Sequence, residues 1–485
     1  MARAVGAGWG PEVLAMWAFL RRVFGGRRHG EAADLSEFAA MLDWAPPPRE
    51  STAARAAMIE RLTQRLAVEA LRRPACVSPD PEATLRALIG EVDAALSAQV
   101  NEILAHPEMR ALERTWRGLA GLARQLPPGG LVQLRVLDVA ENELDTAAER
   151  LKALLFDGVY ATSGAVPFAV LVVDRAFDHR DAPRLAALAR LGAACQMPVL
   201  TQAALTLFKG GTVPRWDVLE TAFDGPGHAE WRALRDRPES RYLCLGLPGL
   251  LGRLPWGDRT APVEAFVFEE AGPPCWVNPA HAMAANIARS VAVHGWATEI
   301  RGQEGGGLVE WLPQTGAAGL SPVEVNLDER QEAHLARLGL AAALRSKGQM
   351  AACFFGAQTL ALPPDGDARV LSRLPYLLFA TRYAQHVMRM AADAPEGEAA
   401  ERFEARVRGW FAGQVRADIG AMTAEEMARH PLQAVSFDVA PGEAARARLV
   451  MTPGHRLEGG ASPVPLELTL PFKAHQPPPS ARQNM

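Results

Sequence analysis

Apolar residues recur at helical spacing in the first part of the chain and indicate two helices, over 49–73 and 80–125. One face of the second helix carries five apolar residues: Leu85, Leu88, Ile89, Val92 and Leu96. The segment LPPGG at 126–130 ends this region, because proline and glycine terminate helices.

Beyond residue 130 the pattern alternates between strands and helices. Strands are predicted at 131–139, 166–174, 241–247, 263–269, 296–300, 322–327 and 351–355. Helices are predicted at about 141–155, from about 182, and near 279–294, 328–338, 367–392 and 398–417. The apolar run 170–173 is typical of a strand that is covered on both faces.

The chain ends in short alternating strands, predicted at 432–440, 445–451 and 464–472. The expected fold class is therefore α/β with mixed α+β character: a helical N-terminal region, a mixed-sheet core with covering helices, and short C-terminal β-strands. The expected parts are an arm with a short amphipathic helix (1–48), a helical region (49–128), a mixed α/β core (129–420), C-terminal strands (421–472) and a disordered tail (473–485).

Composition limits the classes of function. The 485 residues are 49% apolar and 22% charged, as in globular proteins, and a net charge of −4 gives no bulk reason for nucleic-acid binding. Five widely separated cysteines without a CxxC pair indicate reduced thiols rather than disulfides or a zinc site. No apolar run approaches the roughly 20 residues that cross a membrane. The arginine-rich N-terminal arm is either a partner-binding segment or a solvated terminus.

Three consecutive glycines, Gly305, Gly306 and Gly307, could cradle a phosphate or form a tight corner. A phosphate loop needs a lysine and a hydroxyl residue after its glycines, but Leu308 and Val309 follow here. The acids that flank the run would also repel an anion. The glycines are therefore interpreted as a structural corner that needs positive φ or close backbone approach.

A second candidate for chemistry lies after the predicted strand 166–174. Asp174, Asp178, His179 and Asp181 could hold a metal or accept a phosphoryl group, as in an α/β hydrolase or metal-dependent enzyme. The favoured alternative is that Asp174 ends a strand and Asp181 caps a helix. The sequence contains no HExxH motif and no GxSxG motif, and no second acidic or histidine cluster that would complete such a site.

Several ordered stretches carry a family resemblance. They are EILAHPEMRALERTWRGLAGL (102–122), QLRVLDVAENEL (133–144), PFAVLVVDRAFD (167–178), YLCLGLPGLLGRLPWG (242–257), PVEAFVFEE (262–270), IRGQEGGGLVEWLP (300–313), FFGAQTL (354–360) and LSRLPYLLFATRYAQHV (371–387). Together they resemble the large subunit of the type VI secretion contractile sheath, the VipB/TssC (ImpC/EvpB-like) family. The resemblance covers about 85–472, and the first 80 residues depart from it.

The resemblance implies a structural protein of the bacterial cytoplasm without enzymatic activity or cofactor. Its implied partners are a small sheath subunit (VipA/TssB-like), the Hcp tube, neighbouring copies of itself and baseplate components. A ClpV-type AAA+ unfoldase is a further implied partner, through the N-terminal arm. A non-contractile scaffold paralogue remains the alternative within this class.

The predicted strand 464–472 suits a joint between subunits. Its apolar residues lie on one face: Val464, Leu466, Leu468, Leu470 and Phe472. Pro465 and Pro471 lack N–H donors, as is typical of an edge strand. The residues alone leave open whether this is a strand shared between subunits or the last strand of its own domain, and the resemblance favours sharing.

Two further surfaces are expected. Leu112, Trp116, Leu119 and Leu122 form a helical stripe that is either core or a surface that binds the small subunit. Exposed charges would hold the tube weakly, because exposed ion pairs each contribute only about 0–1 kcal/mol. The candidates for these charges are Arg232, Arg235, Asp328, Glu329 and Glu332.

Overall fold

The computed structural model describes residues 68, 80–140, 143, 148–313, 319–346, 351–362, 372–395, 397–440, 446–454 and 463–471. The predicted arm (1–48) and tail (473–485) lie outside this part, as does nearly all of the predicted helix 49–73. The chain divides into two units, 1–92 and 93–485.

Two helices replace the single one predicted over 80–125: α4 (Pro81–Ala105), which begins in the first unit, and α5 (Pro107–Gln125). The break falls at His106, whose ψ of 130° is extended. Proline disfavours a helical conformation at the residue before it and lacks an N–H donor, so Pro107 ends one helix and begins the next.

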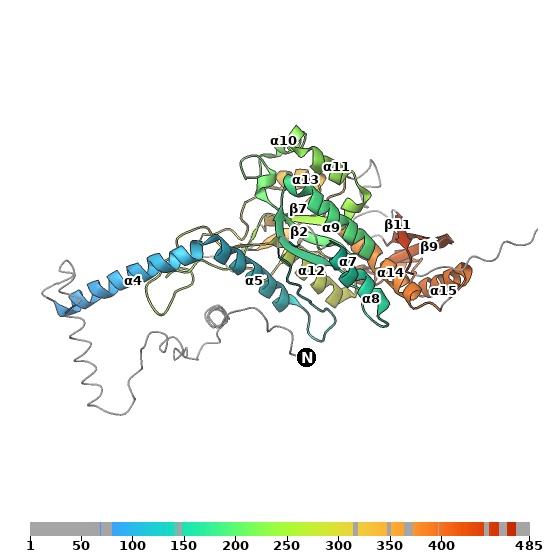
Figure 1. Cartoon of the computed structure of the whole chain (residues 1–485), viewed down its shortest axis with the longest axis horizontal. Helices are drawn as coiled ribbons and strands as arrows, with labels where there is room; N and C mark the ends of the chain where they lie inside the picture. Colours follow the sequence, from blue (N-terminus) through green and yellow to red (C-terminus); the bar gives the residue numbers. More distant parts are fainter. Residues whose placement is uncertain are drawn as a thin grey trace, which may run out of the picture. The chain divides into compact units, whose positions relative to one another are not determined.

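A sheet that includes β2 and β7 forms the centre of the second unit (Figure 1). It has six strands, in the order β1-β2-β3-β7-β8-β6. The strands are β1 (Leu171–Phe177), β2 (Val199–Ala203), β3 (Leu243–Leu247), β7 (Leu340–Arg345), β8 (Ala352–Phe354) and β6 (Leu308–Val309). The first four are parallel, whereas β8 is antiparallel to both β7 and β6. The predicted mixed sheet is confirmed.

Both faces of this sheet are covered. Leu243, Leu245 and Leu247 of β3 pack into one core with α9 (Ala182–Cys195), α11 (Ala229–Arg235) and α13 (Glu329–Arg337). Cys244, between them, packs into a second core with α12 (Pro279–His294). Successive side chains of a strand point to opposite faces, so a strand covered on both sides must be apolar throughout.

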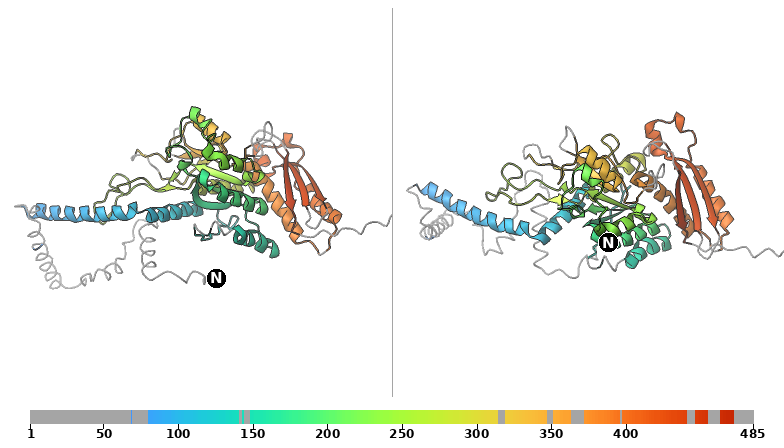
Figure 2. Two further views of the ribbon diagram at one scale, coloured as in Figure 1. Left: turned by 45° about the horizontal axis from the view of Figure 1, so that its top comes forward. Right: turned by 90° about the horizontal axis from the view of Figure 1, so that it is seen from above.

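A separate three-stranded antiparallel sheet lies near the C-terminus, in the order β11-β10-β9. Its strands are β9 (Leu432–Ala440), β10 (Arg446–Pro453) and β11 (Val464–Thr469). α14 (Leu374–Ala392) and α15 (Ala400–Ala412) cover one face of it (Figure 2). The predicted short C-terminal strands are confirmed.

Four predicted strands were wrong: 131–139, 263–269, 296–300 and 322–327 contain no strand. In the second of these, main-chain groups bond to side chains of α4 rather than to another strand. The sequence also gave no prediction for β2 or β7. The predicted helix 141–155 is in part α7 (Ala148–Lys152), which continues through a π-turn (Ala153–Asp157) into α8 (Gly158–Ala161).

Further short elements of the second unit include α10 (Trp216–Leu219), α16 (Ala424–Arg429), β4 (Leu250–Leu251) and β5 (Trp276–Val277).

Candidate assembly surfaces

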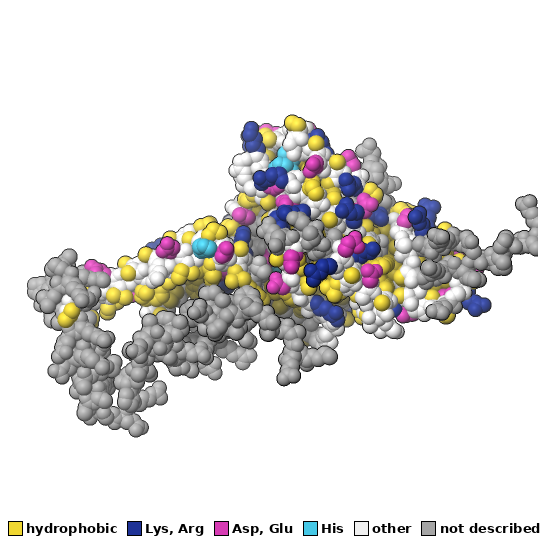
Figure 3. Space-filling model, in the orientation of Figure 1, with side chains coloured by type: hydrophobic (Ala, Val, Ile, Leu, Met, Phe, Trp, Pro, Cys, Tyr) yellow, Lys and Arg dark blue, Asp and Glu magenta, His cyan; other side chains and the backbone are white. Residues whose placement is uncertain are grey.

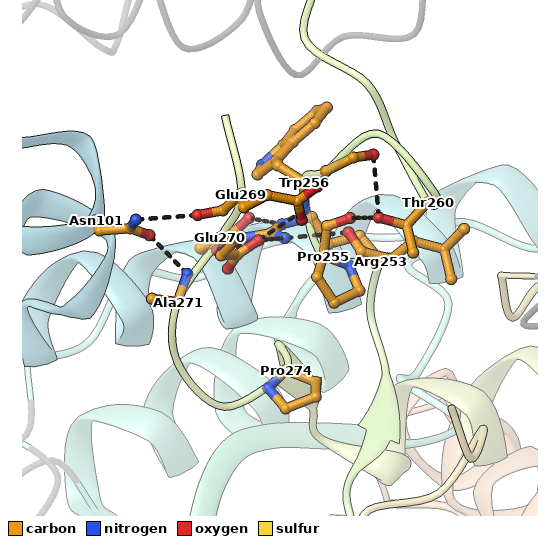
Figure 4. Close-up of polar contacts among 12 residues, drawn as sticks. Asn101, Arg253, Pro255, Trp256, Thr260, Glu269, Glu270, Ala271 and Pro274 are labelled. Carbon is orange, nitrogen blue, oxygen red and sulfur yellow. Dashed lines mark hydrogen bonds and ion pairs between the residues drawn. The ribbon is translucent and has the colours of Figure 1, made fainter. Parts of the chain in front are cut away.

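A buried charge cluster joins α5 to the segment 252–275. Arg253 Nε and Nη2 donate to the Glu113 carboxylate at 2.6 and 3.1 Å, and Arg253 Nη2 also donates to Glu270 at 2.9 Å. The three side chains are only 8–10% exposed. Figure 4 shows Arg253 beside Glu270 and Trp256. The backbone N–H of Trp256 donates to the same Glu270 carboxylate.

Electrostatics within this cluster favour the charged forms. Burial alone would raise the pKa of Glu113, but hydrogen bonds and charge from Arg253, with Arg117, lower it below its ordinary value. Burial likewise opposes the charge of Arg253, and Glu270 and Glu113 outweigh it and raise its pKa. A buried ion pair of this kind stabilises the fold only while all partners are present.

The same segment is also tied to α4. Asn101 donates to the Glu269 carbonyl at 3.0 Å and accepts from the Ala271 N–H at 2.8 Å (Figure 4). Ser97, one turn earlier, donates to the Val267 carbonyl at 3.0 Å. The segment 266–271 is thereby held along the second half of α4 without forming a strand.

The predicted stripe on α5 is divided between surface and core. Leu112 and Trp116 are 40% and 45% exposed, Leu119 is half-buried and Leu122 is 3% exposed. Exposed apolar side chains also follow α4, where Leu96 and Ile103 are 41% and 54% exposed (Figure 3). The first half of the stripe is therefore surface and the second half is core.

The core side of α5 packs closely on its neighbours through two glycines. A Cβ on Gly118 would lie 2.5 Å from Nδ1 of His281 in α12, and a Cβ on Gly121 would lie 2.7 Å from the Trp311 ring. Gly118 and Gly121 are three residues apart and therefore lie on the same helix face. Glycine at position 118 therefore allows α5 to approach α12 closely, and glycine at position 121 leaves room for the Trp311 ring.

The glycine run 305–307 lies beside β8. Gly306 has a φ of 84°, which favours glycine. A Cβ on Gly307 would lie 2.3 Å from the Phe354 carbonyl oxygen, and Phe354 N–H donates to the Gly307 carbonyl at 2.9 Å. The run is thus a corner in which backbone meets backbone.

The candidate tube-facing charges differ in exposure. Arg235 was predicted to be an exposed charge, but it is only 7% exposed. Helix α11 turns its side chain inward, where it donates to the Leu360 and Arg337 carbonyls. Arg232 is half-buried and donates to the Phe223 and Gly225 carbonyls. Asp328 and Glu329 are exposed, and Asp328 caps α13 through the Gln331 N–H.

Glu332, the fifth candidate charge, is half-buried. Burial raises the pKa of its carboxyl group, although Arg301 and Arg373 oppose that shift. It is therefore a weaker candidate for an exposed ion pair than Glu329.

The acidic cluster after β1 has structural partners. Asp178 accepts from the Arg180 backbone and guanidinium and from the Thr206 hydroxyl, and the Arg180 hydrogen bonds hold its pKa well below the ordinary value. Asp181 accepts from the Asp178 N–H, which completes a capping box. Asp178 therefore caps the short 3-10 turn His179–Asp181, and Asp181 occupies the predicted N-cap position of α9 without a side-chain capping hydrogen bond.

The other two members of that cluster have different neighbours. Asp174 lies within β1 rather than at its end, and its carboxylate is 4.0 Å from His281. The His179 ring contacts the His228 ring in a tilted arrangement, with 4.5 Å between the ring centroids. Within the described residues, no group of three or more His, Cys, Asp or Glu side chains could hold a metal ion. None of the helices described has the length and apolarity needed to cross a membrane.

The predicted C-terminal strand pairs within its own chain. β11 runs antiparallel to β10, and Val464, Leu466, Leu468 and Leu470 are buried against α14 and its neighbours. Phe472 lies outside the described residues. β11 is one edge of the three-stranded sheet and β9 is the other.

Sequence reasoning did not identify the Arg253 cluster. Glu113 and Arg253 are 140 residues apart, and each lies among ordinary charged or apolar residues. No local spacing signals the pair. An arginine within the apolar segment 243–256 was the one available sign, because a buried arginine requires partners.

Comparisons with known proteins show which family this chain is similar to. Residues 86–361 match the family described as VipB: EvpB/VC_A0108, tail sheath N-terminal domain. The type VI secretion system sheath protein TssC1 of Pseudomonas aeruginosa is 32% identical over 468 residues, which cover 87% of this chain and 93% of that protein.

Two solved structures show weaker similarity. The sheath tail protein of Desulfitobacterium hafniense is 10% identical with a TM-score of 0.36, and the match covers 69% of this chain and 61% of the other. The contracted helical sheath of the anti-feeding prophage is 13% identical with a TM-score of 0.34, and the match covers 72% and 76%.

Proposed function

Because the chain belongs to the VipB/TssC family of type VI secretion sheath large subunits, we propose that it assembles with a small sheath subunit into a helical sleeve around an Hcp tube. It is a structural sheath protein and not an enzyme. The observation that carries this conclusion is 32% identity to a sheath protein across 87% of the chain. Contraction of the sleeve propels the tube.

β11 is the proposed joint between subunits. A strand at the edge of a sheet can bond to its own sheet on one side and to another chain on the other. The buried residues Val464, Leu466, Leu468 and Leu470 anchor it to the chain's own helices. Main-chain hydrogen bonds then connect neighbours while the bodies of the subunits move.

The exposed half of the α5 stripe is the proposed docking site for the small subunit. Leu112 and Trp116 expose apolar area, and Leu119 and Leu122 continue the stripe into the core. Large aromatic side chains at the border between surface and core commonly anchor protein interfaces. An amphipathic helix of the small subunit would fit this surface.

The tube contact is proposed to use the exposed carboxylates at the start of α13. Asp328 and Glu329 supply negative charge there. Exposed charges associate reversibly, and a tube that must slide requires reversible contacts. We expect Glu329→Lys to reduce the number of tube-filled sleeves and to leave the heterodimer intact.

The remaining partners are neighbouring copies of the chain, baseplate components and a ClpV-type unfoldase, all in the bacterial cytoplasm. The N-terminal arm proposed for the unfoldase, 1–48, lies outside the described residues. Family membership supports these partners.

The direct experiment is co-expression with the small sheath subunit of the same type VI gene cluster, followed by electron microscopy. Sleeves are expected from the full chain. A chain that lacks residues 463–485 should give no sleeves, because the deletion removes the proposed joint together with four buried residues of the C-terminal core. A stable lone monomer that ignores the small subunit would overturn the proposed function.

A further inference from the structure

Helix α14 carries an arginine that has no acidic partner. Arg382 is half-buried, and its Nη1 donates to Gln385 Oε1 at 2.6 Å. Among the residues that the structure describes, no carboxylate forms an ion pair with it. Arg389, two turns further along the same face, donates to Asp393 at 2.9 Å. Because a partly buried guanidinium normally has an acidic partner, the charge of Arg382 lacks a counterpart.

Gln385 fixes the position of this guanidinium. Its side chain is 2% exposed, and Nε2 donates to the carbonyls of Phe168, Cys195 and Gln196 at 2.7, 3.2 and 3.0 Å. These contacts turn Oε1 of the same amide towards Arg382. The guanidinium is therefore positioned before any ligand arrives, which lowers the entropy lost on binding.

A buried hydroxyl beside α14 also lacks a partner. Tyr160 of α8 is 6% exposed, and within the described part of the chain its hydroxyl has no hydrogen-bond partner. Arg389 holds α8 against α14, because its Nη1 donates to the Val159 and Thr162 carbonyls at 3.1 and 2.9 Å. The Arg389 guanidinium also lies 5.9 Å from the centre of the Tyr160 ring. Buried hydroxyl groups usually have a partner, so an acceptor is expected here.

Electrostatics connect the two groups. Burial raises the pKa of the Tyr160 hydroxyl, and the positive charges of Arg382 and Arg389 oppose that shift. Burial lowers the pKa of Arg382. At pH 7 the phenol is a neutral donor and the guanidinium is charged, and the guanidinium offers donors alone. A carboxylate matches this set, because it is negative and accepts through two oxygens.

The surroundings favour a protein side chain over a free anion. Val166, two residues before the carbonyl of Phe168 that binds Gln385, is 75% exposed. His386, one turn after Arg382, is exposed and stacks on Trp410 with 4.0 Å between ring centroids. Apolar and aromatic side chains around an arginine are typical of contacts between proteins.

The location indicates which polypeptide supplies the acid. α14 packs on α8 and on the C-terminal sheet, whereas α5 packs on α12. Figure 1 shows α8 and α14 towards the C-terminal sheet, away from α5. The site is thus separate from the α5 surface proposed for the small subunit, and a neighbouring heterodimer is the expected source.

We propose that Arg382 and Tyr160 form a receptor for the carboxylate of one aspartate or glutamate side chain on a neighbouring heterodimer. This inference rests on the proposed function. The carboxylate accepts from the guanidinium and from the phenol, so both groups are paired only in the assembled sleeve. The hydroxyl is shielded from solvent in the single chain, and docking therefore includes a local adjustment of α8 that uncovers it.

Two variants separate assembly from folding. Tyr160→Phe removes only an unpaired hydroxyl, and Arg382→Gln removes the charge while it retains an N–H donor for Gln385. The unassembled heterodimer should unfold at an unchanged or higher temperature in both cases. The heterodimer concentration at which sleeves form should rise about threefold to tenfold for Tyr160→Phe and about tenfold to a hundredfold for Arg382→Gln.

Arg429→Gln is the matched control for the loss of one positive charge. Arg429 pairs with Glu425 in α16 and is exposed, so this variant should assemble like the unaltered chain. If Arg429→Gln impaired sleeves as much as Arg382→Gln, net charge would explain the loss and the receptor would be refuted.

Site-specific photo-crosslinking identifies the acid. A photoreactive phenylalanine analogue at position 386 should form a cross-link, in sleeves but not in unassembled heterodimers, to a segment of a second polypeptide that contains Asp or Glu. Exchange of that acid for lysine should then restore assembly to Arg382→Glu. Cross-links confined to the chain's own heterodimer, or no gain in assembly from the exchange, would overturn the inference.

Inorganic phosphate tests the other source of a matching anion. At constant ionic strength, millimolar phosphate should give the same shift in the thermal midpoint of unassembled heterodimers for the unaltered chain and for Arg382→Gln. A midpoint that rises with phosphate only in the unaltered chain would assign the site to a free anion and overturn the proposal.

These outcomes separate the two proposals. If the unaltered chain and its small partner give no sleeves, the proposed function fails. If they give sleeves and the folded Tyr160→Phe and Arg382→Gln variants assemble at the same concentration, the function stands and the carboxylate receptor does not.

Discussion

Arg253 donates two hydrogen bonds to the carboxylate of Glu113, at 2.6 and 3.1 Å, although the two residues are 140 positions apart. Glu270 accepts from the same guanidinium. The arrangement fixes the segment 252–275 to α5, next to the exposed residues Leu112 and Trp116. The proposed docking surface therefore depends on a contact that is itself almost fully buried.

Removal of Arg253 should be strongly destabilising. Arg253→Leu leaves the Glu113 and Glu270 carboxylates buried without their shared partner, and loss of one partner of a buried ion pair costs about 3–5 kcal/mol. Urea unfolding of the heterodimer measures the change. Arg429→Ala, which removes an exposed pair with Glu425, should cost less than about 1 kcal/mol. Equal effects of the two substitutions would contradict the role of the cluster.

The same cluster predicts a pH dependence. The folded pKa of Glu113 lies below its ordinary value of about 4.3. Its charge therefore adds stability that is complete above that ordinary value and is lost as pH falls through the folded pKa. Glu113→Gln should reduce the free energy of unfolding at pH 7 by about 1–3 kcal/mol, with a smaller difference below about pH 4.

Glu332 provides a control of opposite sign. Burial raises its pKa, so its charge opposes folding once the pH rises above the raised pKa. Glu332→Gln should be at least as stable as the unaltered chain at pH 7 and indistinguishable from it near pH 3. A loss of stability at pH 7 comparable with that of Glu113→Gln would contradict this assignment.

Local signals explain which elements the sequence predicts. The predicted and observed bounds of α12 agree because Asn278 caps the helix, Pro279 begins it and Gly295 ends it at a φ of 77°. β7 was missed because LAAALR favours helix by composition, and its burial on both faces comes from partners far along the chain. Propensity therefore fails where tertiary contacts decide the structure.

Two glycine-to-alanine substitutions in helices should have opposite effects. Gly118→Ala places a Cβ 2.5 Å from His281 Nδ1, and overpacking of this kind costs about 1–3 kcal/mol. Gly409→Ala in α15 meets nothing within 4 Å and should stabilise by about 0.5–1 kcal/mol, because alanine favours helix. Thermal unfolding compares them. A stabilised Gly118→Ala protein would show that α5 does not pack closely on α12.

The glycine corner should tolerate no side chain at Gly307. A Cβ there would lie 2.3 Å from the Phe354 carbonyl oxygen, which belongs to a buried strand and cannot move aside as a flexible side chain could. Gly307→Ala should therefore cost about 3 kcal/mol or more, or prevent accumulation of folded protein. Gly225→Ala, in open space, should fold normally. The yield and unfolding midpoint of the two proteins provide the comparison.

The divided stripe on α5 separates binding from folding. Trp116→Glu places a charge at an exposed position and should leave stability nearly unchanged while it weakens binding of the small subunit by about 2 kcal/mol or more. Leu122→Glu places the charge in the core and should unfold the chain. Co-purification and unfolding curves distinguish the two results. Normal co-purification of Trp116→Glu would remove this surface from the proposed interface.

The residues of the candidate surfaces could be predicted from the sequence, but which of them are exposed could not. The period of the stripe from Leu112 to Leu122 is visible in the sequence, but which half is buried depends on His281 and Trp311 opposite Gly118 and Gly121. Arg235 shows the same limit, because its charge suggests a surface position while its partners are carbonyls remote in sequence. Alternation along β11 was enough to identify its buried face.

Helix α14 contributes to two cores at once. Leu374 and Leu378 pack with the six-stranded sheet, whereas Phe379 and Tyr383 pack with the C-terminal sheet. Further along, Gln385 donates to the carbonyls of Phe168, Cys195 and Gln196. A force applied to the C-terminal sheet would consequently be transmitted through helix α14 to the six-stranded sheet. During contraction of the sheath, force at a contact between subunits would move the whole subunit, because no flexible linker separates these two sheets along α14.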